Sequence, residues 1–270
     1  MSDICLQVEY RGQSAVLTMN RPEKKNVFNM DMWSALEQVV VRLKANLPRA
    51  IIITGAGGAF SAGFDVNPEN PQIPLLAEAI KKRSRTAVED VVRHIRETVD
   101  KMVALPVPII AAINGLAYGG GAELAARCDM RVMDPGATIC FSEVRLGLMP
   151  DWGGGVALSR LLGRSRAADL ILTARKLGAE ESLSMGLVNR ISSPGKSLDE
   201  SLELAAMIGK NGPLSVRAAL EVIRRSPDIP FRDALELETL IASDLIASGE
   251  CLHGITAFLS KKEPEFPDPK

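Results

Sequence analysis

Apolar residues near the start of the chain follow two different patterns. Over 4–10 and 14–19, apolar and polar positions alternate or apolar residues run together, which predicts two short β-strands. Apolar residues then recur at helical spacing, at Met32, Leu36, Val39, Val40 and Leu43. Asn29 and Asp31 offer side-chain acceptors to the first amides of this predicted helix, and an apolar strand over 50–54 follows. The first third is therefore expected to combine strands with a helix.

The next segment is irregular. Residues 55–65 (GAGGAFSAGFD) are too rich in glycine for regular structure, and three prolines within 67–74 argue against a helix or a central strand there. A loop is predicted for this whole stretch. From Leu75 to Ala104, apolar residues return on one side of a charged segment, which predicts helical structure that covers one side of a pocket.

The remaining chain begins with strands and ends in helices. Residues 105–133 predict a strand, a glycine-rich turn, a short helix and a strand, with the turn at a sheet edge. A further strand is expected over 137–143. Beyond Val156 the pattern is mostly amphipathic and helical, so these helices should pack on the core, on one another or on a second subunit.

Charge and composition narrow the function classes. Lys and Arg number 32 against 33 Asp and Glu, so no overall basic field favours nucleic acid or an anionic membrane. The apolar runs are broken before they reach bilayer length, and residues 1–12 do not resemble a secretory signal, so a cytoplasmic setting is expected. The four cysteines are scattered and only two histidines occur, so no metal site is expected.

Two glycine-rich turns carry candidate chemistry, one over 60–65 and one over 119–123. Glycine permits positive φ and close backbone approach, so such turns can direct bare amides toward a ligand. A helix that begins at the second turn adds the positive end of its dipole. Together the turns suit a carbonyl that becomes an enolate, although tight packing alone is the more frequent use of a single glycine cluster.

Three carboxylates strengthen that interpretation. Glu123 and Glu143 lie in apolar surroundings, where a carboxylate is costly to bury without a function or a partner, and Asp151 follows Pro150. Purely structural roles are also open: a helix N-terminal charge for Glu123, surface ionisation for Glu143, and a turn or N-cap position for Asp151, which is the favoured interpretation of that residue.

At this point the sequence resembles the enoyl-CoA hydratase/isomerase, or crotonase, superfamily. The resemblance covers nearly the whole chain, and its motifs occur in family order at 21–26, 60–65, 110–115, 119–125, 143–150 and 254–258. It implies an α/β fold built as a crotonase-like spiral of ββα units. Residues 1–200 would form this core with the thioester site, and 201–270 a helical region for oligomerisation and pocket closure, in a homotrimer or a dimer of trimers.

The resemblance also implies site residues. The amides of Ala62 and Gly120 would bind the thioester oxygen of an acyl-CoA, which is substrate and not a prosthetic group. Glu123 would deprotonate the water that attacks C3, and Glu143 would deliver a proton to C2. The implied activity is an enoyl-CoA hydratase, a lyase of fatty acid metabolism. Coenzyme A would contact the residues Lys25, Ala62, Asp65, Gly120, Phe258 and Lys261.

Other functions stay open. An acid at the place of Asp151 also occurs in the dienoyl-CoA isomerases of this family, so isomerisation with Glu143 and Asp151 is an alternative. A non-catalytic acyl-CoA-binding homologue is another. Phe60 stands where a dinucleotide fingerprint needs Gly or Ala, and Ser61 lacks the first glycine of a GxSxG elbow, which disfavours nucleotide binding and serine hydrolysis. Val27 and Phe28 also depart from the Ala-Leu that is common in the family.

Overall fold

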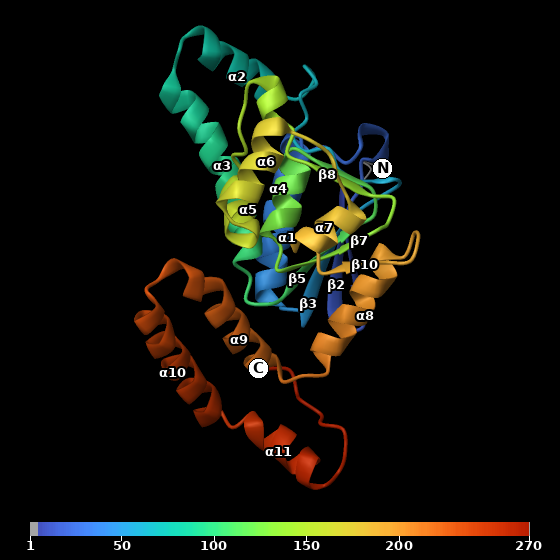
Figure 1. Cartoon of the computed structure of the whole chain (residues 1–270), viewed down its shortest axis with the longest axis vertical. Coiled ribbons are helices and arrows are strands. Elements are labelled where there is room, and N and C mark those ends of the chain that lie inside the picture. The colour runs from blue at the N-terminus through green and yellow to red at the C-terminus, as the bar shows by residue number, and fades with distance from the viewer. Residues whose placement is uncertain (1–4, 270) are drawn as a thin grey trace.

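The computed structural model describes residues 5–269 and contains two β-sheets surrounded by helices (Figure 1). In the described residues the larger sheet has six strands in the order β1 (Leu6–Arg11), β2 (Ser14–Met19), β3 (Ala50–Gly55), β5 (Ile109–Ile113), β7 (Met130–Met133) and β10 (Arg190–Ile191). The smaller sheet orders β4 (Ala59–Ser61), β6 (Leu116–Tyr118), β8 (Thr138–Cys140) and β9 (Leu177–Gly178). Pairing is parallel except in β1–β2 and β8–β9.

From β3 to β8, consecutive strands alternate between the two sheets. β3, β5 and β7 are neighbours in the larger sheet, and β4, β6 and β8, which follow them in the chain, are neighbours in the smaller one. Each turn of the chain therefore adds one strand to each sheet, and a helical segment then leads back to the larger sheet. This arrangement is a spiral of ββα units. The predicted α/β class and its repeated unit are confirmed.

Helices cover both faces of the larger sheet. The helix α1 (Met30–Ala45) packs against α3 (Arg85–Val103), and its predicted apolar residues are buried in the main core. Asn29 caps α1 by accepting a hydrogen bond from the Met32 amide at 3.1 Å. On the opposite face, α8 (Ser197–Gly209) packs on β2, β3, β5 and β7 around a second, smaller core.

The segment after residue 66 differs from the prediction in two respects. A first helix, α2 (Gln72–Lys81), begins inside the proline-rich stretch, and α3 starts only after a break. Pro74 is the third residue of α2, where the amide has no acceptor within the helix, so proline is tolerated. The break contains Arg83 at φ 50°, which ends one helix, and Ser84, whose hydroxyl accepts from the Ala87 amide at 3.4 Å and caps the next.

The helices α9 (Pro213–Arg225), α10 (Phe231–Ala247) and α11 (Cys251–Leu259) extend away from the core (Figure 1). The chain then returns, and Arg49 binds it through the Asp268 carboxylate at 2.8 Å and the Phe266 carbonyl at 2.5 Å. The predicted boundary after residue 200 falls within α8, which packs on the sheet, so the extension starts at Pro213. Among residues 5–269 no helix has the length and apolar character that a bilayer crossing requires.

The connecting elements are short. They comprise the 3₁₀ turns η1 (Pro22–Lys24), η2 (Glu143–Leu146) and η3 (Ser226–Asp228) and the helices α4 (Gly120–Arg127), α5 (Gly154–Leu162), α6 (Arg164–Thr173) and α7 (Ala179–Met185). Two of these elements follow strands of the smaller sheet: α4 comes directly after β6, and η2 comes shortly after β8. The candidate carboxylates Glu123 and Glu143 lie in their first turns.

Candidate active site

Glu123 is held in a fixed orientation by backbone amides of the segment that follows Pro150. Its carboxylate accepts hydrogen bonds from the amides of Asp151 at 3.2 Å, Trp152 at 2.8 Å and Gly154 at 2.9 Å. Gly154 is the first residue of α5, so the carboxylate also lies at the positive end of that helix. These donors stabilise the ionised form of Glu123.

Glu143 lies in an opposite environment. Only 8% of its surface is exposed, and neither carboxyl oxygen has a hydrogen-bond partner among the described residues. Burial raises the pKa of Glu143, because an ionised carboxylate without donors is costly in an apolar setting. The prediction of a buried acid is confirmed, and surface ionisation of Glu143 is wrong.

The two carboxyl groups are close enough to influence each other. Burial and, next, the charge of Glu143 together raise the pKa of Glu123 to about 8, against the lowering effect of the Gly154 amide. When two carboxyls interact, such a pKa belongs to the pair and marks the pH at which the pair loses its last proton. Its own backbone amide and the facing Glu123 lower the pKa of Glu143, but by less than burial raises it. Because three amides donate to Glu123 and no group among the described residues is hydrogen-bonded to the Glu143 carboxyl oxygens, the geometry favours this proton on Glu143.

Asp151 lies at the edge of this pair, with its side chain on the solvent-exposed side. Burial of part of the group raises its pKa, and its charge raises the pKa of both glutamates. The N-cap of α5 is Gly153, so an N-cap role for Asp151 is wrong. The residue instead stands where the chain turns into the loop that holds Glu123.

Gly120 is the first residue of α4, and its amide has no acceptor in the described part of the chain. The preceding Gly119 has φ 53° and ψ −128°, a conformation that is available essentially to glycine alone. This geometry lets the chain leave β6 and enter α4 with the Gly120 amide uncovered. The expected amide donor at Gly120 is therefore present.

The second expected donor requires a correction. The Ala62 amide already donates to the Lys25 carbonyl at 2.9 Å, and the Gly63 amide donates to the Ser61 hydroxyl at 3.1 Å. The next amide, that of Phe64, has no acceptor within residues 5–269. Phe64 therefore replaces Ala62 as the candidate partner of Gly120.

Gly63 brings these two uncovered amides together. Its φ is +88°, and a Cβ atom there would lie 2.7 Å from the Gly120 amide nitrogen and 3.0 Å from the Tyr118 carbonyl oxygen. The peptide that carries the Phe64 amide is thus packed directly against the start of α4. The signal in the sequence was the glycine itself, since a residue at positive φ redirects the amide that follows it.

A cluster of three aromatic side chains supports the site from behind. Phe28, Trp33 and Trp152 have ring centroids 4.6–5.2 Å apart, and each is at most 3% exposed. The Trp152 indole lies against Gly120, where a Cβ atom would come within 2.5 Å of the ring. Phe28, a departure from the family pattern, is therefore a core residue. The role of Trp152 was not predicted from the sequence, because no local pattern indicates it.

The residues expected to bind coenzyme A form two groups in the single chain, one around the two glycine-rich turns and one at the end of α11. Lys25 is exposed, and its carbonyl holds the Ala62 amide. Asp65 is buried and forms an ion pair with Arg21 at 2.9 Å, so its carboxylate stabilises the loop. Phe258, which is 82% exposed, and Lys261 belong to the α11 end of the extension, away from the core (Figure 1).

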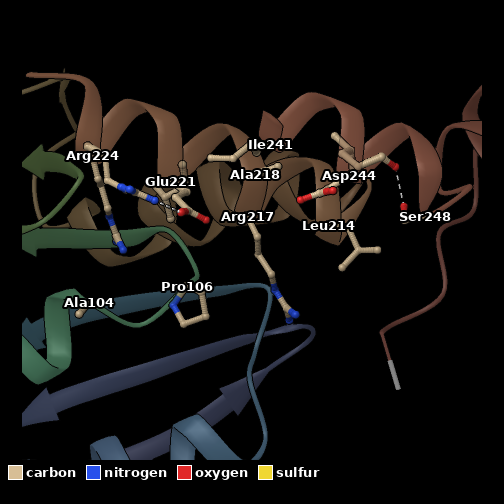
Figure 2. A pocket seen from close by; sticks show the side chains of 13 residues that line it. Ala104, Pro106, Leu214, Arg217, Ala218, Glu221, Arg224, Ile241, Asp244 and Ser248 are labelled. Carbon is tan, nitrogen blue, oxygen red and sulfur yellow. Dashed lines mark hydrogen bonds and ion pairs between the residues drawn. The ribbon is translucent and has the colours of Figure 1, made fainter. Parts of the chain in front are cut away.

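A cavity of about 610 Å³ lies away from the carboxylate pair. Figure 2 shows it between α9, α10 and the loop of Ala104 and Pro106. On one side Arg224 donates to the Asp129 carboxylate at 2.6 Å and to the Leu105 carbonyl at 2.8 Å. These bonds attach α9 to the core, so the cavity is a gap between the core and the extension.

Comparison with known proteins agrees with these features. A family model described as enoyl-CoA hydratase/isomerase matches residues 11–269. A putative enoyl-CoA hydratase of Thermus thermophilus is 35% identical over 265 residues, which cover 97% of this chain and 100% of that protein. The enoyl-CoA hydratase EchA19 of Mycobacterium tuberculosis is 34% identical, with 96% and 95% covered.

Solved structures show the same fold. The crystal structure of an enoyl-CoA hydratase from Bacillus anthracis superposes with a TM-score of 0.86 at 31% identity, covering 97% of this chain and 98% of that one. A putative enoyl-CoA hydratase from Streptomyces coelicolor gives 0.89 at 26% identity, with 99% and 96% covered. The spiral of ββα units is thus the crotonase fold, and the chain belongs to the enoyl-CoA hydratase/isomerase family.

Proposed function

We propose that this protein is an enoyl-CoA hydratase that adds water across the 2,3 double bond of an enoyl-CoA. The observation that carries the proposal is the pair of buried carboxyls in contrasting surroundings. Glu123 accepts hydrogen bonds from three backbone amides, whereas the Glu143 carboxyl accepts none from the described residues. Such a contrast separates the functions of base and acid between two otherwise identical side chains.

The reaction follows from these protonation states. The amides of Phe64 and Gly120 donate to the thioester oxygen and stabilise the negative charge that develops on it. Ionised Glu123 takes a proton from water as its oxygen bonds to C3, and protonated Glu143 gives its proton to C2 as the enolate collapses. Glu123 has then gained one proton and Glu143 has lost one, so transfer between the facing carboxyls restores the resting pair.

The test is a product-resolved assay with crotonyl-CoA. Hydration predicts a decay of the enoyl absorbance together with formation of 3-hydroxybutyryl-CoA, identified by mass. The Glu123→Gln variant should lose this decay, since an amide cannot act as a base. Tight binding of crotonyl-CoA without turnover by the wild-type protein would instead support a non-catalytic acyl-CoA-binding protein.

The proton count of the pair predicts the pH dependence of hydration. Catalysis needs one proton on the two carboxyls, and this proton is lost as the pH rises through about 8, the value to which burial and Glu143 raise the pKa of Glu123. The kcat/KM for crotonyl-CoA should therefore fall tenfold per pH unit above that point, and fall again at low pH as Glu123 becomes protonated. A profile that is flat between pH 6 and 10 would contradict the shared proton.

A second candidate function is isomerisation of an enoyl- or dienoyl-CoA with Asp151 as proton shuttle. Its support is the position of Asp151 beside the carboxyl pair and the burial that raises its pKa. If hydration is the function, Asp151→Asn should retain crotonyl-CoA hydration within about threefold, because Asn preserves the backbone amide that binds Glu123. Loss of 3-enoyl to 2-enoyl conversion in this variant, with hydration retained, would assign isomerisation to Asp151.

We also propose a homotrimer, alone or as a dimer of trimers, in which the extension meets another copy. Its support is the apolar surface of α10 and α11, where Phe231 is 80%, Phe258 82% and Leu259 75% exposed. Lys25 of one copy, with Phe258 and Lys261 of another, would then contact coenzyme A. Mass measurement by light scattering tests the assembly, and Lys261→Ala should raise KM without lowering kcat.

A further inference from the structure

Arg127 connects the helix of the candidate site to the loop that holds Glu123. It is the last residue of α4, the helix that also carries Gly120 and Glu123, and its side chain is 18% exposed. Its guanidinium donates from Nη1 to the Trp152 carbonyl at 2.9 Å and from Nη2 to the Asp100 carboxylate at 2.7 Å. The bond to Asp100 continues the connection to α3.

The backbone of the loop is adapted to this contact. Gly153 has φ +90°, and a Cβ atom at this position would overlap the Nη1 atom of Arg127. Glycine at 153 suits the positive φ, and its missing side chain leaves the space that the guanidinium occupies. Two independent features, the hydrogen bond and the missing side chain, thus place Arg127 against the loop.

Trp152 is the residue through which this contact reaches the site. Its carbonyl accepts from Arg127, its amide donates to Glu123 at 2.8 Å, and its indole packs against Gly120. A shift of Trp152 would therefore disturb the orientation of the base and the packing behind an uncovered amide together. The indole also belongs to the aromatic cluster with Phe28 and Trp33, which limits its freedom to adjust.

We propose that Arg127 is a positioning residue that, oriented by Asp100 of α3, holds Trp152 so that the loop amides keep Glu123 in place. Arg127 makes no contact with the reacting atoms in this arrangement. Its effect on turnover rests on the proposed function, whereas its effect on the ionisation of Glu123 does not. The other charged groups that face Glu123 are Glu143 and Asp151, both acidic, so the loop amides are its stabilising neighbours.

The experiment compares Arg127→Met with the wild-type protein in two measurements. In the ligand-free protein, the side-chain carboxyl of Glu123 is titrated by carbon NMR and assigned with Glu123→Gln. Loss of amide donors should raise the pKa of Glu123 by about one unit, because an ionised carboxylate then loses hydrogen bonds. In the crotonyl-CoA assay, kcat should fall about 10- to 100-fold with KM changed less than threefold, as expected for a displaced catalytic group.

The matched control is Arg96→Met. Arg96 also forms an ion pair with Asp100, but it does not contact the loop, so its loss should leave the Glu123 titration and kcat unchanged. Arg127→Lys keeps a positive charge and a donor and should recover most of kcat. If Arg127→Met does not fold, Asp100→Asn serves in its place and should move the Glu123 titration in the same direction by a smaller amount.

Each outcome decides between the two proposals. An identical Glu123 titration in Arg127→Met and Arg96→Met overturns the positioning role, whatever the catalytic rates are. A shifted titration in a protein whose wild type does not hydrate crotonyl-CoA supports the positioning role and overturns the proposed function. A fall in kcat without a shifted titration also counts against positioning through Glu123.

Discussion

Replacing Glu143 with glutamine is expected to reduce kcat for crotonyl-CoA hydration by about 10³-fold, within the range of a lost general acid. Glutamine has nearly the same shape but no transferable proton, so C2 of the enolate would lack its donor. KM should change little, because the thioester oxygen is bound by backbone amides that the substitution does not touch. The measurement is the decay of the enoyl absorbance of crotonyl-CoA, which Glu143→Gln should slow by this factor while it still binds crotonyl-CoA.

The same substitution should make the protein more stable at alkaline pH. Burial raises the pKa of Glu143 in the folded state, so the folded protein holds this proton more tightly than the unfolded chain. Wild-type stability from this group is present at low pH and is lost as the pH rises through the folded pKa. Glutamine does not titrate, so the gain in Tm should be larger at pH 9 than at pH 6.

Glu203→Gln is the matched control for both effects, since Glu203 is an exposed residue of α8. It should change neither kcat nor the pH dependence of Tm. Unimpaired hydration by Glu143→Gln would remove Glu143 from the mechanism and favour an acid elsewhere in the site.

Replacing Gly63 with alanine is expected to lower kcat by about 10²- to 10³-fold, the effect of losing one oxyanion donor. A Cβ atom at 63 would stand 2.7 Å from the Gly120 nitrogen, and alanine is strained at φ +88°. Both effects move the Phe64 and Gly120 amides apart. The thioester carbonyl stretch of bound crotonyl-CoA, measured by Raman spectroscopy, should shift less in this variant than in the wild type.

Gly186→Ala controls for strain alone. Gly186 has φ +83°, close to that of Gly63, but no atom would lie within 4 Å of its Cβ. This variant should lose stability without losing the Raman shift or kcat. Equal activity in Gly63→Ala and Gly186→Ala would show that the Phe64 and Gly120 amides do not bind the thioester.

The patterns of apolar residues predicted local structure well where packing and periodicity agree. The apolar residues of α1 are buried as expected, and the early strands form the larger sheet. The proline-rich stretch was less successful, because the effect of Pro74 depends on whether it stands in the first turn of a helix or later. Position within an element is a property that composition alone does not contain.

The carboxylates were predicted from residue type and spacing, but their different functions were not a property of the sequence. Glu123 and Glu143 are chemically identical, and the structure distinguishes them by three amide donors to one and none to the other. The donors come from a loop 28–31 residues away, so no local signal could have identified them. The same holds for Arg127 and Trp152, which meet across 25 positions.

The sequence by itself determined the α/β class, the family and the two carboxylates, because periodicity, motif order and the cost of burying charge are written in the residues. Only the tertiary structure decided which amides stay uncovered, and it replaced Ala62 with Phe64 as the candidate donor. It also showed that the Asp65 carboxylate forms an ion pair with Arg21. The physical reason is that a hydrogen bond belongs to two groups, and the partner is often far along the chain. Whether a donor is available to a ligand therefore depends on which distant acceptor the fold brings to it.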